Sequence, residues 1–168
     1  MVIFTRHSIR NTMISFIGEY DCKADAKGRI LLPAAFVRQL PEGHSGRFVI
    51  KRDLYAACLE MFPIEEWDRQ ERLLVRNLNP YDPEHRQIVR DFHMGACEVT
   101  LDASKRFLLT ARLLKQIDAE RDIVLLGSIG KIEIWNPAIY RQNDATPEDK
   151  AERARRLMQH ATYNLDDL

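Results

Sequence analysis

The sequence predicts a mainly β protein with short helices, an α+β fold built from two tandem, pseudo-symmetric modules. Three observations lead to this prediction. A sixteen-residue segment occurs twice, each copy has the pattern strand, turn, strand, short helix, strand, strand, and apolar residues make up 45% of the 168 residues, enough for a core. One module alone has strands that are apolar on both sides. We therefore expect the second copy to complete its core in a double-barrel-like unit.

The repeated segment is "DAKGRILLPAAFVRQL" (25–40) and "DASKRFLLTARLLKQI" (102–117). Aligned without a gap, seven of its sixteen positions are identical. The repeat continues where "CLEMFPIEEW" (58–67) aligns with "KIEIWNPAIY" (131–140), and the offset changes from 77 to 73 because the loops between differ in length. Duplicated folds tolerate such insertions in polar loops.

The strands of the first copy follow from local patterns. "SFIGEYDCKA" (15–24) is strand-like, and "DAKG" (25–28) predicts a type I turn with Asp first and Gly fourth. The short apolar strand "RILL" comes next, and then a helix over "PAAFVRQL", with Pro33 suited to the first helical position. "RFVIKR" and "AACLEMF" predict a strand pair.

Capping residues mark the starts of the other helices. In the second copy Thr110 replaces Pro33, and Thr is a good N-cap, so two different residues mark the same start. Between the copies, "PIEEWDRQERLLVRNL" has apolar residues on one face, and "DPEHRQIVRDF" opens with Asp82 as a cap and Pro83 in the first turn. After the second copy, "TPEDKAERARRLMQHA" begins at Thr146 with a pattern similar to a capping box.

These elements divide the chain into five segments. We expect an N-terminal extension, a first module, a helical linker, a second module, and a C-terminal helix with a tail, at 1–12, 19–66, 67–94, 95–138 and 139–168. Residues 1–12 have no counterpart in the second copy and no signal-peptide pattern. No stretch approaches the roughly 18–20 apolar residues of a membrane helix, so no membrane span is expected.

Charge and cysteine content exclude several classes of function. Lys+Arg and Asp+Glu are equal at 25 each, so the formal net charge is zero and only a local patch is expected to bind phosphate. Cys22, Cys58 and Cys97 are an odd number without disulfide spacing, and we expect them to be buried in a protein of a reducing compartment. No nucleophile elbow, Walker loop or paired-carboxylate motif occurs. We therefore expect no enzyme, no cofactor and no small-molecule substrate.

At "EYDCKADAKGRILLPAAFVRQL" the chain resembles the SpoVT-AbrB DNA-binding module, with Asp-x-Lys-Gly-Arg, an apolar run, Pro, and a short helix that ends in Arg. Two copies in one chain, closed by "CLEMFPIEEW" and "EIWNP", resemble the MraZ family over roughly residues 13–140. The resemblance implies a bacterial transcriptional regulator of cell-division and cell-wall genes. It also implies a ring-like homo-oligomer that is cytoplasmic and associated with the nucleoid. The chain departs from the family pattern at Lys105, where Gly is usual, and at Thr110, where Pro is usual.

The candidate DNA contacts lie on the two turns. Alternate positions of a hairpin point the same way, so we predict that Lys27 and Arg29 of the first turn contact DNA. Lys105 and Arg106 are predicted to do so from the second turn. Arg holds phosphate or guanine with a bidentate fork, and Lys supplies a compact charge.

Asp25 and Asp102 are predicted to brace these turns by accepting backbone amides or by orienting the arginines. The alternative is an Asp–Arg pair on the surface without a role in binding, an interaction of the kind that contributes only about 0–1 kcal/mol to stability. Because Arg106 occurs where the first copy has Arg29, DNA contact by both arginines is favoured.

Other candidate residues are expected to be structural. Arg38 and Lys115 end the short helices, where the helix dipole favours cations. Phe62, Trp67 and Trp135 could stack on bases, but apolar neighbours favour a place in the core.

A zinc site is the weakest candidate. His93 and Cys97, with His85 nearby, fall short of the four ligands that zinc usually takes, so we expect a hydrogen-bonded His and a buried Cys. The sequence as a whole predicts a sequence-specific regulator of transcription. It would bind direct repeats in double-stranded DNA as a homo-oligomer, through paired basic hairpins. The alternatives are a structural protein whose repeats serve only assembly, and a metal-dependent enzyme built around His93 and Cys97.

Overall fold

The computed structural model describes residues 13–159, which belong to two compact units, Met1–Pro137 and Ala138–Leu168, each described by itself. The predicted N-terminal extension, 1–12, and the end of the predicted tail lie outside the described residues. In chain order, the elements are β1 Glu19–Lys23, β2 Arg29–Leu31, α1 Ala34–Gln39, β3 Arg47–Arg52, β4 Cys58–Pro63, α2 Ile64–Asn77, α3 Pro83–His93, β5 Cys97–Thr100, β6 Arg106–Leu108, α4 Ala111–Gln116, β7 Asp122–Gly127, β8 Ile132–Trp135, α5 Pro137–Gln142 and α6 Pro147–Met158. The predicted fold class, mainly β with helices in two tandem modules, is confirmed.

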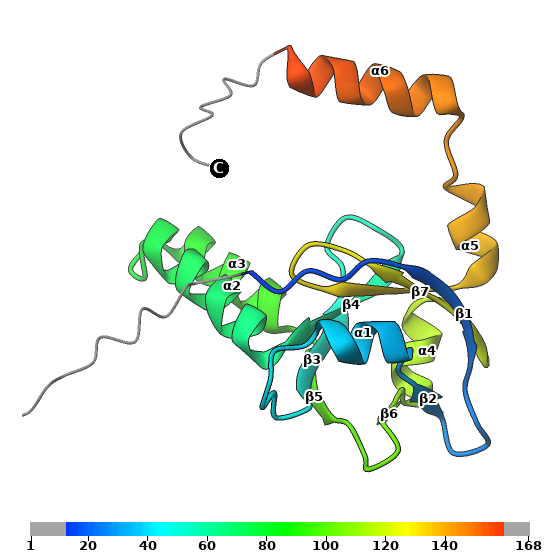
Figure 1. The fold of residues 1–168 in the computed structure, drawn as a ribbon. Helices are drawn as coiled ribbons and strands as arrows, with labels where there is room; N and C mark the ends of the chain where they lie inside the picture. Colours follow the sequence, from blue (N-terminus) through cyan, green and yellow to red (C-terminus); the bar gives the residue numbers. More distant parts are fainter. Residues whose placement is uncertain (1–12, 160–168) are drawn as a thin grey trace, which may run out of the picture. The chain divides into compact units, whose positions relative to one another are not determined.

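The two repeats exchange strands within the first unit (Figure 1). Six antiparallel strands form one sheet in the order β1-β7-β8-β4-β3-β5, and β2 pairs with β6 in a second sheet. The first strand of each repeat therefore pairs with the third strand of the other, as β1 with β7 and β5 with β3. Neither repeat completes a sheet from its own strands, so the duplication supplies the partner that one module lacks.

The strand registers show where the pseudo-two-fold axis passes. In the β2–β6 pair, Ile30 lies opposite Phe107, and in the β4–β8 pair, Glu60 lies opposite Glu133. Each of these pairs joins one residue to its own equivalent in the other repeat. An antiparallel pairing centred on equivalent residues has two-fold symmetry, so the halves of the first unit are related by an axis through both pairs.

The core of the first unit lies between the exchanged strands and the helices α1 and α4. Phe36 of α1 and Leu113 of α4 are fully buried there. Phe62, Trp67 and Trp135 are also buried, as predicted from their apolar neighbours. Their rings are therefore covered and do not offer stacking platforms to a nucleic acid.

Most helix starts agree with the capping signals. Thr110 Oγ1 accepts a hydrogen bond from the Leu113 amide at 3.4 Å, and Asp82 accepts from two amides in the first turn of α3. Both predicted caps are confirmed. The first helix begins at Ala34 rather than at Pro33, because Pro33 has an extended ψ of 136° and is itself the N-cap.

The first strand is shorter than the sequence predicts. It covers Glu19–Lys23, whereas "SFIGEYDCKA" predicted a strand that starts near Ser15. Gly18 interrupts the strand, because it has a φ of 136°, a backbone conformation that residues other than Gly rarely adopt. Upstream of this break, Ser15 makes one isolated bridge to Ile129.

A cluster of buried and half-buried charges surrounds the axis where β4 meets β8. Glu60 and Glu133 are like charges directly opposite, which destabilises a strand pair. Lys131 Nζ compensates them, 2.5 Å from Glu60 Oε1 and 3.7 Å from Glu133 Oε1, and the buried Lys51 Nζ lies 3.0 Å from Glu60 Oε2. Burial lowers the pKa of Lys131, but the hydrogen bond to Glu60 and the nearby carboxylates outweigh it and raise the pKa overall.

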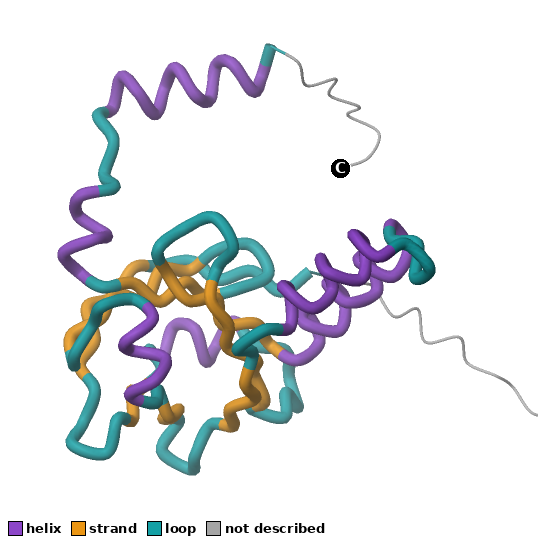
Figure 2. The backbone as a smooth tube through the Cα atoms, turned by 180° about the vertical axis from the view of Figure 1, so that it is seen from behind, coloured by secondary structure: helices purple, strands orange, loops and turns teal. Residues whose placement is uncertain are grey.

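Helices α2 and α3 form an antiparallel pair that joins the repeats (Figure 2). A small second core holds this pair to the sheet, and the rings of Trp67 and Phe92 stack there at 4.8 Å. The His93 ring packs against both Trp67 and Phe92, and its Nε2 lies 2.8 Å from Glu71 Oε1. The two helices correspond to the helical stretches that the sequence predicts at 63–78 and 82–92, and α3 ends one residue later than predicted.

The second unit contains α6 and most of α5. Thr146 Oγ1 accepts a hydrogen bond from the Asp149 amide at 3.2 Å, which confirms the predicted cap of α6. Leu157 and Met158 are exposed at the end of α6. Helix α5 has only six residues, and no capping signal in the sequence predicted it.

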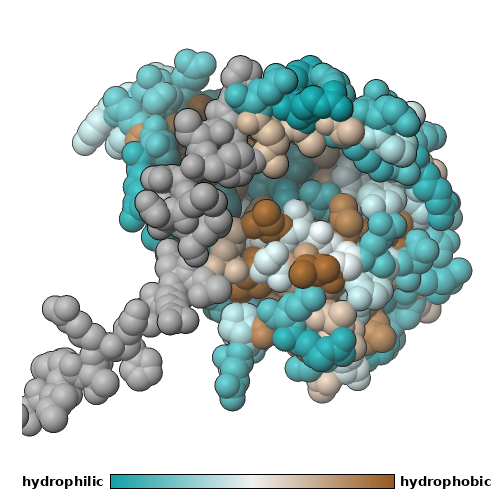
Figure 3. All heavy atoms as spheres, turned by 45° about the horizontal axis from the view of Figure 1, so that its top comes forward, coloured by the Kyte–Doolittle hydropathy of each residue, from teal (hydrophilic) through white to brown (hydrophobic). Residues whose placement is uncertain are grey.

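The surface mixes polar and apolar residues. On the face seen in Figure 3, hydrophobic residues form several separate patches among hydrophilic ones. Between residues 13 and 159, no helix combines the length and the apolar character needed to cross a membrane.

Candidate nucleic-acid interface

The first turn is braced by the Asp25 side chain. Asp25 Oδ1 accepts hydrogen bonds from the amides of Lys27 and Arg29, both at 2.9 Å, and the Gly28 amide donates to the Asp25 carbonyl at 3.0 Å. Gly28, at the fourth position, has a φ of 80°. Asp therefore closes the turn through its side chain, and Gly permits the backbone to return.

The second turn repeats these contacts with different residues. Asp102 Oδ1 accepts from the amides of Ser104 at 2.8 Å and Arg106 at 2.9 Å, and the Lys105 amide donates to the Asp102 carbonyl at 2.9 Å. Lys105 stands where the first copy has Gly28 and has a φ of 62°. A Lys thus adopts the left-handed conformation that a Gly supplies in the first turn.

Each arginine is also held by its aspartate. Arg29 Nε and Nη2 both lie 2.8 Å from Asp25 Oδ2, and Arg106 Nε lies 3.0 Å from Asp102 Oδ2. Arg106 Nη1 is 3.9 Å from Asp25 Oδ2, so the two hairpins also meet electrostatically. These ion pairs orient both arginines and leave about a third of each arginine side chain exposed.

The aspartates are held in the charged form. The pKa of Asp25 lies below its ordinary value, chiefly because the Arg29 amide donates to it. The pKa of Asp102 is lowered in the same way by the Arg106 amide. Deprotonated carboxylates keep both turns braced at neutral pH.

The predicted hairpins are not strand pairs, because β1 pairs with β7, β5 pairs with β3, and β2 pairs with β6, so each turn joins strands of two different sheets. The two turn segments are tied to each other by reciprocal backbone hydrogen bonds. The Leu32 amide donates to the Lys105 carbonyl, and the Leu109 amide donates to the Gly28 carbonyl, both at 2.9 Å. Arg121 adds a side-chain contact, because its Nε and Nη2 donate to the Ala24 carbonyl at 3.0 and 2.9 Å, just before the first turn. Both turns project from the same side of the first unit (Figures 1 and 2).

The structure brings Arg29 and Arg106 together at the start of the paired strands β2 and β6, and Lys27 and Lys105 lie on the adjoining turns. Lys27 and Lys105 are exposed, and Arg29 and Arg106 are half-buried by their ion pairs. With two aspartates among four cations, the turns carry a local excess of two positive charges. A cavity of about 480 Å³ lies beside the first turn and is lined in part by Lys27 and Arg121. Sequence reasoning missed Arg121, because the repeat puts no basic residue at the corresponding place in the first copy.

The remaining candidates lie apart from this surface or have other partners. Arg38 and Lys115 are in the last turns of α1 and α4, as expected. His93 Nδ1 lies 2.8 Å from the Val89 carbonyl, and its hydrogen bond to Glu71 raises the pKa of His93. His85 Nδ1 accepts from the Asn79 amide. No group of three or more His, Cys, Asp or Glu residues that could hold a metal ion occurs within residues 13–159.

The cysteines are less uniformly buried than predicted. Cys58 on the inner strand β4 is buried, whereas Cys22 and Cys97 are only half-buried because β1 and β5 are the edge strands of the sheet. Burial raises the pKa of the Cys22 thiol to about 11 and that of Cys58 to about 12. The thiols therefore stay protonated at neutral pH, and a thiolate nucleophile is disfavoured.

Comparisons with known proteins agree with the resemblance noted in the sequence. A family model described as "MraZ protein, putative antitoxin-like" matches twice, over residues 15–91 and 92–161. A protein of Christiangramia forsetii is 35% identical over 87% of this chain and 94% of its own length. Proteins of Phocaeicola vulgatus (34%, over 85% of this chain and 93% of their own) and Desulfitobacterium hafniense (38%, over 80% and 90%) are also similar. All three carry the name "Transcriptional regulator MraZ".

Proposed function

The chain belongs to the MraZ family, and from this premise we propose that it regulates transcription by binding double-stranded DNA through the two turns that join β1 to β2 and β5 to β6. The observation that carries the proposal is the pairing of the two turns about the pseudo-two-fold axis. This pairing brings Arg29 and Arg106 into one two-stranded ribbon, with Lys27 and Lys105 on the turns that precede them. One duplex contacts all four cations in this proposal.

The Asp–Arg pairs support this function through orientation. A guanidinium that is already fixed by a carboxylate loses less side-chain entropy when it binds a phosphate or a guanine. Arg29 keeps Nη1 outside the short contacts with Asp25. The remaining donors of each arginine are thus aimed by the turn rather than by a flexible side chain.

The small local charge implies that several units act on one DNA. The logarithm of the binding constant falls with the logarithm of the salt concentration, with a slope of about 0.9 for each phosphate neutralised. A single unit neutralises few phosphates and therefore has modest affinity. Linked sites gain avidity through effective concentration, without new contacts. We therefore propose a ring-like homo-oligomer on direct repeats, associated with the nucleoid and controlling the cell-division and cell-wall gene cluster.

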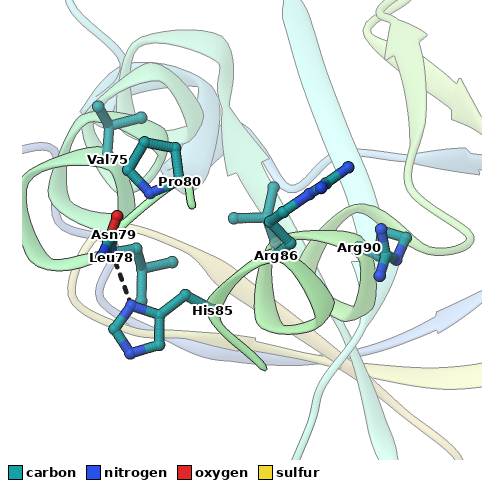
Figure 4. A pocket seen from close by; sticks show the side chains of 8 residues that line it. Val75, Leu78, Asn79, Pro80, His85, Arg86 and Arg90 are labelled. Carbon is teal, nitrogen blue, oxygen red and sulfur yellow. Dashed lines mark hydrogen bonds between the residues drawn. The ribbon is translucent and has the colours of Figure 1, made fainter. Parts of the chain in front are cut away.

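Apolar surface on the helical pair supports assembly. A cavity of about 390 Å³ opens between α2 and α3, and its lining is largely apolar. Figure 4 shows that the residues around it come from the end of α2, the following loop and α3: Val75, Leu78, Asn79, Pro80, His85, Arg86, Val89 and Arg90. Leu73, Val75, Ile88 and Val89 are exposed on the two helices. A second copy of the chain would bury these side chains.

The binding surface is tested with DNA from upstream of the protein's own gene. We expect the Arg29→Ala/Arg106→Ala double variant to bind this duplex more weakly in gel shifts and with a salt slope lower by about 2, since each lost phosphate contact removes about 1. Arg38→Ala/Lys115→Ala, which also removes two charges, from the ends of α1 and α4, is the matched control. If the Arg29→Ala/Arg106→Ala variant has the affinity of the wild type while both remain folded, the hairpins do not bind DNA.

The arrangement on DNA is tested with a series of spacings. Units held in one assembly meet the duplex on one face, so their sites should recur near 10 base pairs, one helical turn. Two binding repeats moved apart by half a turn should lose affinity, and a further half turn should restore it. Equal affinity for one repeat and for several would leave an independent single-unit binder.

One observation favours the alternative, a structural protein whose repeats serve only assembly. Two donors of Arg29 are already bonded to Asp25, as a purely structural ion pair would require. In that case the double variant changes the mass of the assembly in light scattering, and the wild type shows no salt-dependent binding to the upstream DNA.

A further inference from the structure

The outer face of the β2–β6 ribbon carries two exposed leucines. Strand side chains alternate, and Ile30 and Phe107 at the centre of the pair are buried. Their neighbours point the opposite way, so Leu31 is 60% exposed and Leu108 is 46% exposed. Large apolar side chains on a polar turn surface lose water when a partner covers them, and this favours a partner with an apolar group.

The register puts each leucine beside an arginine. Arg29 lies opposite Leu108, and Leu31 lies opposite Arg106. Directly opposite residues of an antiparallel pair have Cβ atoms about 4.5–5.5 Å apart, so the four side chains form one two-fold patch. Each aspartate holds its arginine at the turn, so the arginine is fixed next to the leucine.

The charge of this patch decides which partner fits. Two copies of the chain that met through it would bring Arg29, Arg106 and the turn lysines face to face, which costs energy. A DNA duplex carries the complementary charge. Its major groove, about 12 Å wide, admits a two-stranded β-ribbon, and the only apolar group on the base edges there is the C5 methyl of thymine.

We propose that Leu31 and Leu108 determine part of the sequence specificity by contacting thymine methyl groups in the major groove, while the flanking arginines bind phosphate or guanine. The inference rests on the proposed DNA-binding function and deepens it. It adds two residues that carry no charge and that the basic surface alone does not require. Its distinctive consequence is that the protein distinguishes thymine from uracil, which lacks only the methyl group.

The test compares two forms of the upstream duplex, one made with thymine and one with uracil in its place. A buried methyl or methylene group contributes enough to change affinity about fourfold. We therefore expect the wild type to bind the uracil duplex about fourfold more weakly for each methyl contacted, or about 15-fold for two. The Leu31→Ala/Leu108→Ala variant should bind both duplexes equally, with the salt slope of the wild type. Leu54→Ala, which shortens an exposed leucine of the loop after β3, is the matched control and should still distinguish the duplexes.

The outcomes separate this inference from the proposed function. If the wild type shows no salt-dependent binding to the thymine duplex, both are wrong. If it binds the two duplexes equally, or if the double variant distinguishes them as the wild type does, only the leucine contact is wrong. A double variant that loses assembly mass in light scattering would show that a second copy covers the leucines, which also overturns the inference.

Discussion

The turn at Gly28 can be tested by a single methyl group. Gly28 has a φ of 80°, and a Cβ added there would lie 3.0 Å from the Leu109 carbonyl oxygen, closer than most real Cβ contacts. The left-handed conformation costs a residue with a Cβ about 1–2 kcal/mol. The Leu109 backbone cannot move away freely, because its amide is bonded to the Gly28 carbonyl. Gly28→Ala should therefore lower the free energy of unfolding by about 1–2 kcal/mol.

The second turn provides the opposite experiment. Lys105 already adopts a φ of 62°, so Lys105→Gly removes a strain of about 1–2 kcal/mol. It also adds about 0.4–1 kcal/mol of chain entropy to the unfolded state, and the net gain should be about 0.5–1 kcal/mol. Lys105→Ala keeps a Cβ at the same backbone position, so its stability should stay near that of the wild type.

Urea denaturation measures all three variants. The expected order of stability is Lys105→Gly, then wild type with Lys105→Ala, then Gly28→Ala. A Gly28→Ala protein as stable as the wild type would refute the assigned turn geometry, and so would a Lys105→Gly protein that is less stable. In gel shifts, Lys105→Gly and Lys105→Ala should lose DNA affinity equally, because both remove the same charge and only one changes the backbone.

Charge clusters and the helical pair give three more expected outcomes. Lys131→Met leaves Glu60 with one lysine instead of two. It should lower the free energy of unfolding, measured by urea denaturation, by about 2–3 kcal/mol, less than the roughly 3–5 kcal/mol lost when a buried pair is broken completely. A stability equal to that of Lys131→Arg would contradict this. The raised pKa of His93 implies a stabilisation that is complete below pH 6.5, the ordinary pKa, and is lost as the pH rises through the raised pKa. The stability of the wild type should therefore fall in that pH window relative to His93→Gln. Parallel pH profiles of the two proteins would argue against the Glu71 contact. Val75→Glu adds a carboxylate to the apolar cavity between α2 and α3, so a second copy should bind this surface less well and light scattering should detect a smaller assembly. An unchanged mass would exclude this surface from the interface between copies.

The sequence could predict the turns because their chemistry is local. Asp25 at the first position and Gly28 at the fourth predict the first turn. Because Asp102 aligns with Asp25 in the repeat, the same turn is predicted there. It could not predict that Lys105 adopts a left-handed conformation. That conformation is stabilised by a bond from outside the turn, since the Lys105 carbonyl accepts from the Leu32 amide of the other hairpin.

Long-range pairing accounts for most of what sequence reasoning missed. Hydrophobic alternation shows that a segment is a strand but does not show which strand it pairs with, so the exchange of β1 and β5 between the repeats stayed hidden. The charge cluster was missed for the same reason. Lys51 comes from the first repeat and Lys131 from the second, and the alignment puts Cys58 at the position of Lys131, so the repeat gave no sign of a shared site.

Departures from symmetry bear on the proposed binding to DNA. Each turn has one lysine, but Lys27 occupies the third position of its turn and Lys105 the fourth of the other, where Ser104 and Gly28 are the respective equivalents. The two basic hairpins are therefore unequal although the β2–β6 register is two-fold. A fully symmetric unit matches an inverted repeat, whereas unequal hairpins give the unit a direction. Units that have a direction and all face the same way in an assembly match direct repeats. A homodimer of identical modules is symmetric and would match an inverted repeat, so duplication followed by divergence suits the proposed mode of binding better.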